Sequence, residues 1–187
     1  SITSKKVDMS DFGVPQSRKR SIFLLTRKDI NPIWKFPDKT KKVTIKEAIG
    51  FLPTLDPFIS EKEFDEHKFF HNFENKLKKA LSISALHTPV AHPIRQIISM
   101  QHTPSGKTAF YNIYAYKPKN KEGKPIKVFN NTYKRMEWNK PAPTITTYNR
   151  TISSQQNVHP GRRLYKGSNV LYSDPRVLTL YELMKIM

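Results

Sequence analysis

Residues 13–25 read GVPQSRKRSIFLL, a glycine-proline turn and a basic cluster that lead into an apolar run. The β-branched and aromatic run Ile22–Leu25 is typical of a short buried strand. In an extended backbone alternate side chains share a face, so we expect Gln16, Arg18 and Arg20 to project together. Two guanidinium forks beside an amide suit a phosphate and a base edge. An ordinary basic edge strand is the alternative interpretation of the same residues.

Helix starts are indicated by three capping boxes, in which a Ser or Thr lies three residues before a Glu. The pairs are Thr44 with Glu47, Ser60 with Glu63, and Thr179 with Glu182. The first pair predicts a short helix within Val43–Leu52, which Pro53 ends. The second predicts a longer helix that reaches about Leu81, and the third opens the last helix. A further helix is expected to begin at Pro93, where a missing N–H costs nothing.

Strand signals are scattered between and after these helices. The run Phe110–Tyr116 favours strand, and the β-branched run Thr144–Thr147 is similar in character. The stretch Lys117–Lys127 is rich in Lys, Pro, Gly and Asn, which is typical of an exposed hairpin or loop. Short helices mixed with scattered strands predict an α+β fold class.

The amino-acid composition limits which classes of function and partner are expected. The chain has 187 residues, with 33 Lys+Arg against 15 Asp+Glu and a formal net charge of +18. A polyanion is therefore the expected partner, nucleic acid first and an anionic membrane second, and a merely solvated basic surface is the alternative. The sequence contains no cysteine, which excludes disulfides, thiolate metal sites and cysteine nucleophiles among these residues. No apolar run is long enough to span a membrane.

Both ends of the sequence are expected to be internal to a longer protein. Ser1–Asp11 lacks the apolar stretch of a secretory signal, and the helical pattern of Leu178–Met187 stops without a cap. Together with the charge, these features predict a cytoplasmic, DNA-associated protein.

Three ordered segments carry a family resemblance. They are the block Pro-Gln-x-Arg-x-Arg at 15–20, the run PAPTITT at 141–147 followed by the pair His159-Pro160, and Arg-x-Leu-Thr-x-x-Glu at 176–182. In this order, and over nearly the whole chain, they resemble the C-terminal third of DNA (cytosine-5) methyltransferases. The first segment resembles the family's eighth conserved block, and the others resemble the end of its target-recognition domain and its ninth block.

The resemblance implies a division of the chain. Residues 1–30 would be an edge segment of the α/β catalytic domain. Residues 31–170 would form a small target-recognition domain of short twisted strands and short helices. Residues 171–187 would begin the ninth-block helix of the catalytic domain.

The resemblance also implies a function, the recognition of DNA by an enzyme of the restriction-modification kind that flips a cytosine from the duplex and methylates its C5. Arg20 would hold the flipped base near its O2, Arg18 would lie by that pocket and a phosphate, and Gln16 would support both. Hydroxyl, amide and guanidinium groups suit phosphates and base edges. The expected DNA-binding residues are Thr144, Thr146, Arg150, Ser153, Ser154, Gln155, Gln156 and Arg176.

The sequence departs from the family in what it lacks. It has neither the Pro-Cys block with the nucleophile nor the Gly-rich block that holds S-adenosylmethionine. S-adenosylmethionine is therefore expected in a part of the enzyme outside these residues, and this stretch alone is expected to be inactive. Its partners would be duplex DNA and the catalytic half, in the same chain or as a separate subunit, with no membrane involved.

Two other interpretations use different residues. His67 and His71 have a spacing that suits a metal, but no third ligand is evident, so we expect no metal site. The stretch Lys117–Lys134 is interleaved with the rings of Tyr114, Tyr116, Phe129 and Tyr133. It could be a platform for single-stranded nucleic acid, and a module of that kind without catalysis is the alternative function.

Overall fold

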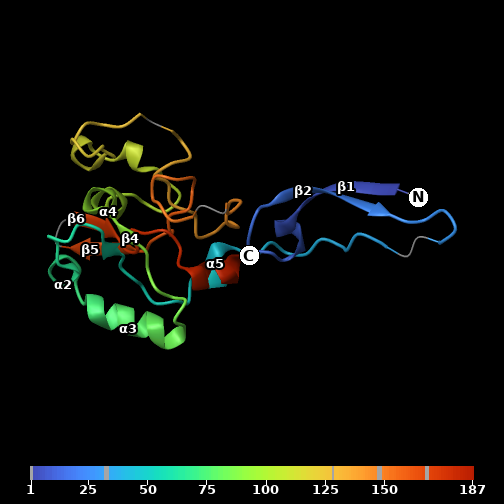
Figure 1. Cartoon of the computed structure of the whole chain (residues 1–187), viewed down its shortest axis with the longest axis horizontal. Helices are drawn as coiled ribbons and strands as arrows, with labels where there is room; N and C mark the ends of the chain where they lie inside the picture. Colours follow the sequence, from blue (N-terminus) through green and yellow to red (C-terminus); the bar gives the residue numbers. More distant parts are fainter. Residues whose placement is uncertain (1, 32–33, 128, 147–148, 167–168) are drawn as a thin grey trace.

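A long hairpin and a helix-containing body make up the chain (Figure 1). The computed structural model describes residues 2–31, 34–127, 129–146, 149–166 and 169–187. Strands β1 (Ile2–Asp8) and β2 (Lys19–Leu25) are antiparallel, with a register that runs from Ile2 opposite Leu25 to Asp8 opposite Lys19. The 3-10 turn η1 (Met9–Phe12) begins the connection between them. The chain then returns along the hairpin, where the Thr40 N–H donates to the Asp11 carbonyl.

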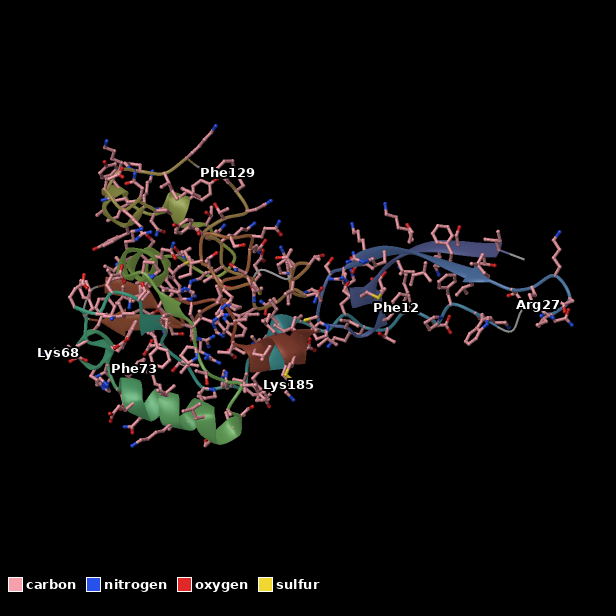
Figure 2. The ribbon with its side chains drawn as sticks, viewed as in Figure 1. Phe12, Arg27, Lys68, Phe73, Phe129 and Lys185 are labelled. Carbon is pink, nitrogen blue, oxygen red and sulfur yellow. The ribbon has the colours of Figure 1, made fainter. Side chains whose placement is uncertain are left out.

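The hairpin projects away from the body, and side chains stand out on both of its sides as far as Arg27 near the tip (Figure 2). The expected strand at Ile22–Leu25 is confirmed within β2, but the expectation that it is buried is wrong. Phe23 is 62% exposed and Leu25 is 70% exposed. A two-stranded sheet covers neither of its own faces, so burial of β2 would require another layer.

The body contains the remaining elements in an α+β arrangement, as expected. Strands β3 (Phe58–Ile59) and β4 (Ala91–His92) pair in parallel, and strands β5 (Arg163–Lys166) and β6 (Asn169–Tyr172) pair antiparallel. Among the described residues, no helix is both long and apolar enough to cross a membrane. In chain order the elements are α1 (Ile45–Ile49), β3 (Phe58–Ile59), α2 (Glu66–Phe69), α3 (Phe73–Ile83), β4 (Ala91–His92), α4 (Ile94–Gln101), η2 (Ala109–Tyr111), η3 (Tyr114–Tyr116), β5 (Arg163–Lys166), β6 (Asn169–Tyr172) and α5 (Leu180–Ile186).

Two of the three predicted capping boxes are confirmed, at the starts of α1 and α5. The expected start of α4 after Pro93 is also confirmed. The box at Ser60 and Glu63 is wrong, because the Ser60 hydroxyl donates to the neighbouring Glu61 carboxylate. Asp65 and Asn72 instead precede α2 and α3. The predicted single helix is divided because Phe70 is extended and Asn72 has a left-handed φ of 59°.

The strand expected at Phe110–Tyr116 is wrong, because η2 and η3 occupy this run. The Asn112 amide nitrogen donates to the Ser99 and Tyr116 carbonyls and holds the chain in two consecutive turns. Lys117–Lys127 forms the expected loop, with one bridge between Lys119 and Pro125. Residues 144–146 are not in a strand, and Thr147 lies outside the described residues.

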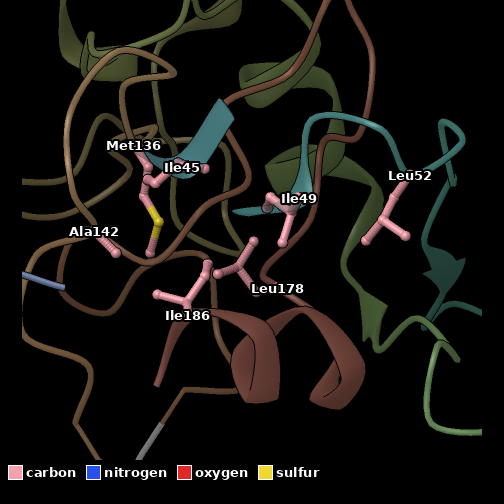
Figure 3. Packing of buried hydrophobic residues seen from close by; sticks show 7 residues of the cluster. All are labelled: Ile45, Ile49, Leu52, Met136, Ala142, Leu178 and Ile186. Atoms are coloured by element: carbon pink, nitrogen blue, oxygen red, sulfur yellow. The ribbon is translucent and has the colours of Figure 1, made fainter. Parts of the chain in front are cut away.

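The main apolar cluster joins segments that are far apart in the sequence (Figure 3). Burial of side chains of this kind contributes about 1.5–3 kcal/mol each. This cluster packs α1 against α5, so the last helix contacts residues of the expected recognition domain. The expected domain boundaries at residues 30 and 170 stay a prediction. The cluster contains Ile45, Ile49, Leu52, Met136, Ala142, Leu178 and Ile186.

Two further clusters complete the core of the body. One surrounds α4 and the segments that follow it, with Met100, Ala109, Phe110, Tyr133, Ile152, Val158 and Val177. The other lies between α3, α4 and β3, with Ile59, Phe70, Phe73 and Ile97. The aromatic residues near His67 are therefore mostly core.

Candidate nucleic-acid interface

The segment before β2 lies beside residues 142–144, more than one hundred residues later in the chain. The Ser17 N–H donates to the Ala142 carbonyl, and the Ala142 N–H donates to the Pro15 carbonyl, both at 2.8 Å. The Thr144 hydroxyl adds a hydrogen bond of 2.9 Å to the Ser17 carbonyl. The Pro-Gln-x-Arg-x-Arg block and the PAPTITT run are thus in direct contact.

This contact forms a hollow of about 520 Å³ that carries two guanidinium groups and two threonine side chains. Arg18 directly precedes β2 and Arg20 lies in it, and Thr144 and Thr146 come from the opposite segment. Leu183 and Met187 of the C-terminal segment supply an apolar wall. Four of the expected site residues therefore line one space, which we call the arginine hollow.

Gln16 does not line the arginine hollow. It is buried, and over the described part of the chain its side-chain Oε1 has no hydrogen-bond partner. The expectation that Gln16 projects together with Arg18 and Arg20 is wrong, because the extended strand begins only at Lys19. A tight turn, in which the Gln16 N–H donates to the Val14 carbonyl, precedes it and breaks the alternation.

Asp8 fixes the backbone at the edge of the arginine hollow. Its carboxylate accepts hydrogen bonds from the Ser17 hydroxyl at 2.7 Å and from the Arg18 N–H at 3.0 Å. Although partial burial alone would raise the pKa of Asp8, the bonds from Ser17, Ser10 and Arg18 lower it to about 2. Asp8 stays ionised and positions Arg18. Sequence reasoning missed it, although the Asp-x-Ser pattern at 8–10 signals a cap of this kind.

The segment 149–157 alternates between buried and exposed residues. Asn149, Ile152 and Asn157 are buried and anchor it. Between them lie the five other expected DNA-binding residues of this segment, with Ser154 and Gln156 partly buried and Arg150, Ser153 and Gln155 exposed. The exposed three are available to a ligand on the surface.

Arg150 lines a second hollow of about 760 Å³, bordered by residues 85–86 and 88–91 and by α5. Asn149 and Leu183 line this hollow and the arginine hollow alike. The two spaces are therefore neighbours, and exposed cationic side chains border both.

Arg176 does not reach the surface, so its expected contact with DNA is wrong. Its guanidinium is buried and donates to Glu182 at 2.7 Å, to Asp174 at 3.0 Å and to the Leu55 carbonyl at 2.8 Å. Burial by itself would raise the pKa of Glu182, but the attraction of the Arg176 cation is stronger and lowers this pKa to about 2. Arg176 is a structural cation whose donors are taken by the protein.

His159 of the His-Pro pair lies beside the same ion pairs. Burial, despite the nearby Asp174 and Glu182, lowers the pKa of His159 to about 4. Its Nδ1 accepts a hydrogen bond of 3.0 Å from the Gly161 N–H, which requires an unprotonated nitrogen. The His-Pro pair is therefore a neutral structural element in this fold.

Within the described ranges, no group of three or more His, Asp or Glu side chains is placed to hold a metal ion.

The platform for single-stranded nucleic acid that was considered at Lys117–Lys134 lacks part of its expected set of exposed rings. Tyr133 is buried, and the Tyr116 ring stacks on His102 with the centroids 3.4 Å apart.

Comparison with known proteins decides the family. The C-5 cytosine-specific DNA methylases match residues 1–187. This chain belongs to that family. The methylase chain is 41% identical over 180 residues to the Type II methyltransferase M1.HgaI of Avibacterium volantium. This match covers 96% of the chain and 43% of that relative. The chain thus spans less than half of the length of this relative.

Shorter matches point the same way. The Type II methyltransferase M.MthTI of Methanothermobacter thermautotrophicus is 41% identical over 58 residues, 30% of the chain and 18% of that protein. M.XorII of Xanthomonas oryzae is 36% identical over 52 residues, 28% of the chain and 12% of that protein. None of these relatives supports the alternative of a single-strand-binding module without catalysis.

Proposed function

We propose that this methylase chain is the DNA-recognition part of a DNA (cytosine-5) methyltransferase that flips its target cytosine out of the duplex. The supporting observation is the arginine hollow, where Arg18 and Arg20 meet Thr144 and Thr146. Family membership over residues 1–187 supports the chemistry. A base must leave the stack before its ring carbon can be reached, so a cationic hollow at a junction of segments suits a flipped nucleotide.

Each arginine has a distinct part in this proposal. One nitrogen of Arg20 donates to the Lys19 carbonyl, which orients the guanidinium and leaves its other donors for the O2 of the flipped cytosine. Arg18, whose backbone Asp8 holds, binds a phosphate beside the pocket. Gln16 supports both arginines from the buried side, through the pairing of its segment with Ala142.

Thr144 contacts DNA as an acceptor. Its hydroxyl has a single proton, and that proton is donated to the Ser17 carbonyl. A phosphate oxygen needs a donor, whereas the amino group of a base needs an acceptor. The remaining lone pairs of Thr144 therefore suit an amino group. Arg150, Ser153 and Gln155 have exposed side chains and reach phosphates and base edges, with Thr146, Ser154 and Gln156 beside them.

S-adenosylmethionine supplies the methyl group in this family. Beside its single carboxylate it carries two cationic groups, a sulfonium and an ammonium, while the arginine hollow presents two guanidinium groups and no carboxylate, so this hollow does not fit it. No cysteine exists among the 187 residues. We therefore assign the cofactor site and the nucleophile to a catalytic part outside these residues, in the same polypeptide or in a second subunit.

The hairpin is the surface that we assign to this catalytic part. Two strands alone bury little apolar area, and an isolated hairpin is marginal in water. Ile2 and Phe23 are nevertheless 73% and 62% exposed, and Trp34 on the returning chain is 67% exposed. A layer of the catalytic part that packs against the face of the hairpin would cover these side chains.

The experiment that tests the proposal is transfer of radiolabelled methyl from S-adenosylmethionine to duplex DNA. The chain alone, the polypeptide encoded immediately upstream alone, and their mixture are compared, with single-stranded DNA as a second substrate. We expect label in duplex DNA only from the mixture. Label from the chain alone would contradict the assignment of the nucleophile elsewhere. A silent mixture of two folded polypeptides would contradict the proposed function.

A further inference from the structure

Three large apolar side chains are exposed within four residues of the body. Tyr111 is 81% exposed, and Ile113 and Tyr114 are each 68% exposed. Single exposed apolar side chains are common on protein surfaces, but a contiguous group of them marks a binding surface. These residues belong to η2, η3 and their junction. Tyr114 was named only in the alternative single-strand platform, and none of the three was among the residues expected to bind duplex DNA.

The backbone beneath these side chains is held firmly. The Asn112 amide nitrogen lies 2.9 Å from the Ser99 carbonyl, 3.1 Å from the Thr103 hydroxyl and 3.2 Å from the Tyr116 carbonyl. Phe110 is buried with its ring against Tyr133, at 5.9 Å between centroids. The exposed side chains are thus presented by a preformed surface, which lowers the conformational cost of binding.

The surroundings of this surface are cationic. Residues 107–134 contain seven lysines and a single acidic residue, Glu122. The Lys119 ammonium lies 5.2 Å from the centre of the Tyr114 ring, so the charge and the apolar group are adjacent. A polyanion with apolar groups between its charges is the complementary partner.

The surface also shares its support with the segment that carries Arg150. Phe110 and Ile152 belong to the same buried cluster. Figure 1 shows residues 109–127, in yellow, at the top of the body, with the orange 149–157 region between them and the base of the hairpin. One extended ligand can therefore contact this surface and the segment 149–157 together.

We propose that this aromatic-lysine surface, defined as Tyr111, Ile113, Tyr114, Lys119, Lys121 and Lys124, reads base pairs of duplex DNA in the major groove. The apolar side chains contact thymine methyl groups, and the lysines bind the flanking phosphates. Single-stranded nucleic acid fits less well, because the buried Tyr133 and the stacked Tyr116 remove two rings from any stacking array. The inference rests on the proposed function and adds residues that determine sequence choice.

The test is a selection from a pool of duplexes with randomised sequence, using the full chain. The variant Tyr111→Ala/Ile113→Ala/Tyr114→Ala removes the apolar groups, and Tyr165→Ala is the matched control, because Tyr165 is 73% exposed on β5. Circular dichroism checks that each variant is folded. We expect the wild type and the control to enrich the same site. The triple variant should lose about 5- to 150-fold discrimination at one or more base pairs.

A second variant separates the recognition of bases from the binding of phosphates. Lys119→Ala/Lys121→Ala/Lys124→Ala should keep the enriched site and lower the slope of log affinity against log salt by about 0.9 for each phosphate that the variant no longer neutralises. An unchanged site and unchanged discrimination in the aromatic triple variant would overturn the inference alone. Absence of duplex binding by the folded wild-type chain would overturn the proposed function, and the inference with it.

Discussion

The Arg176 guanidinium donates to both carboxylate oxygens of Glu182, at 2.7 Å and 2.9 Å, inside the fold. The same carboxylate accepts the Thr179 N–H at 2.8 Å and so completes the capping box of α5. The start of the last helix and the neutralisation of a buried cation are therefore one structural unit. Because α5 packs on α1 and lines the arginine hollow, this unit also positions one wall of the hollow.

Arg176→Leu should destabilise the fold strongly, because it leaves Asp174 and Glu182 buried without their cation. We expect the free energy of unfolding to fall by about 3–5 kcal/mol. Urea unfolding followed by circular dichroism measures the change. Arg163→Leu, at an exposed position of β5, is the control and should change the free energy of unfolding by less than about 0.5 kcal/mol. Equal unfolding midpoints for the two variants would contradict the structural role of Arg176.

Stability should fall as pH decreases from about 6.5 to about 4. Burial lowers the pKa of His92 and of His159 from 6.5 to about 4. In that window the unfolded chain binds protons that the folded chain excludes, so acid favours unfolding. The geometry agrees, because each ring accepts a backbone N–H, from Val177 for His92 and from Gly161 for His159.

Urea unfolding at a series of pH values measures this effect. Each histidine contributes a slope of up to about 1.4 kcal/mol per pH unit. His92→Gln keeps an acceptor for the Val177 N–H and should reduce the slope. A flat profile for the wild type between these pH values would contradict the prediction.

Gly161→Ala should cost more stability than Gly123→Ala, although both glycines have a positive φ, of 69° and 79°. The left-handed conformation alone costs a non-glycine residue about 1–2 kcal/mol. At Gly123 a Cβ meets nothing within 4 Å, while at Gly161 it collides with the Arg135 guanidinium and lies 2.7 Å from the Ser173 carbonyl. Thermal unfolding of the two variants compares them directly. A similar loss in both would exclude the packing contribution.

Arg20→Ala should reduce methyl transfer by the assembled enzyme about 10- to 100-fold, the effect of removing one charge-assisted hydrogen bond. Duplex affinity should change little, because in the proposed function Arg20 holds the flipped base rather than the duplex. Lys19→Ala is the matched control, since the neighbouring Lys19 is exposed and does not line the arginine hollow. Steady-state methyl transfer and duplex binding are measured in parallel. A parallel collapse of binding and activity would refute this assignment.

Duplex affinity should fall steeply with salt, because the formal net charge is +18. The logarithm of the affinity should decrease linearly with the logarithm of the salt concentration, with a slope of about 0.9 per phosphate neutralised. Fluorescence anisotropy with a labelled duplex measures this slope. Arg150→Ala should reduce it by about 0.9, whereas Arg163→Ala should not. A flat dependence would mean that the cationic surface does not bind DNA.

Local sequence patterns were predictive where the interaction itself is local. The capping boxes at Thr44 and Thr179 join residues three apart, so their chemistry is visible in the sequence. The pattern at Ser60 does not form a capping box, because the Ser60 hydroxyl donates to the carboxylate of the neighbouring Glu61 instead. The run at Phe110–Tyr116 failed as a strand because Asn112 binds the Ser99 carbonyl, a longer-range contact that strand propensity does not contain.

The sequence by itself determined the charge, the family and the residue types of the arginine hollow, because these depend on composition and on short ordered motifs. Only the tertiary structure decided that Thr144 donates its proton to Ser17, that Gln16 turns inward and that Arg176 is buried. An arginine in a sequence has the same chemistry on the surface and in the core. Its role depends on whether carboxylates such as Asp174 and Glu182 fold around it, and that is a property of packing rather than of the residue.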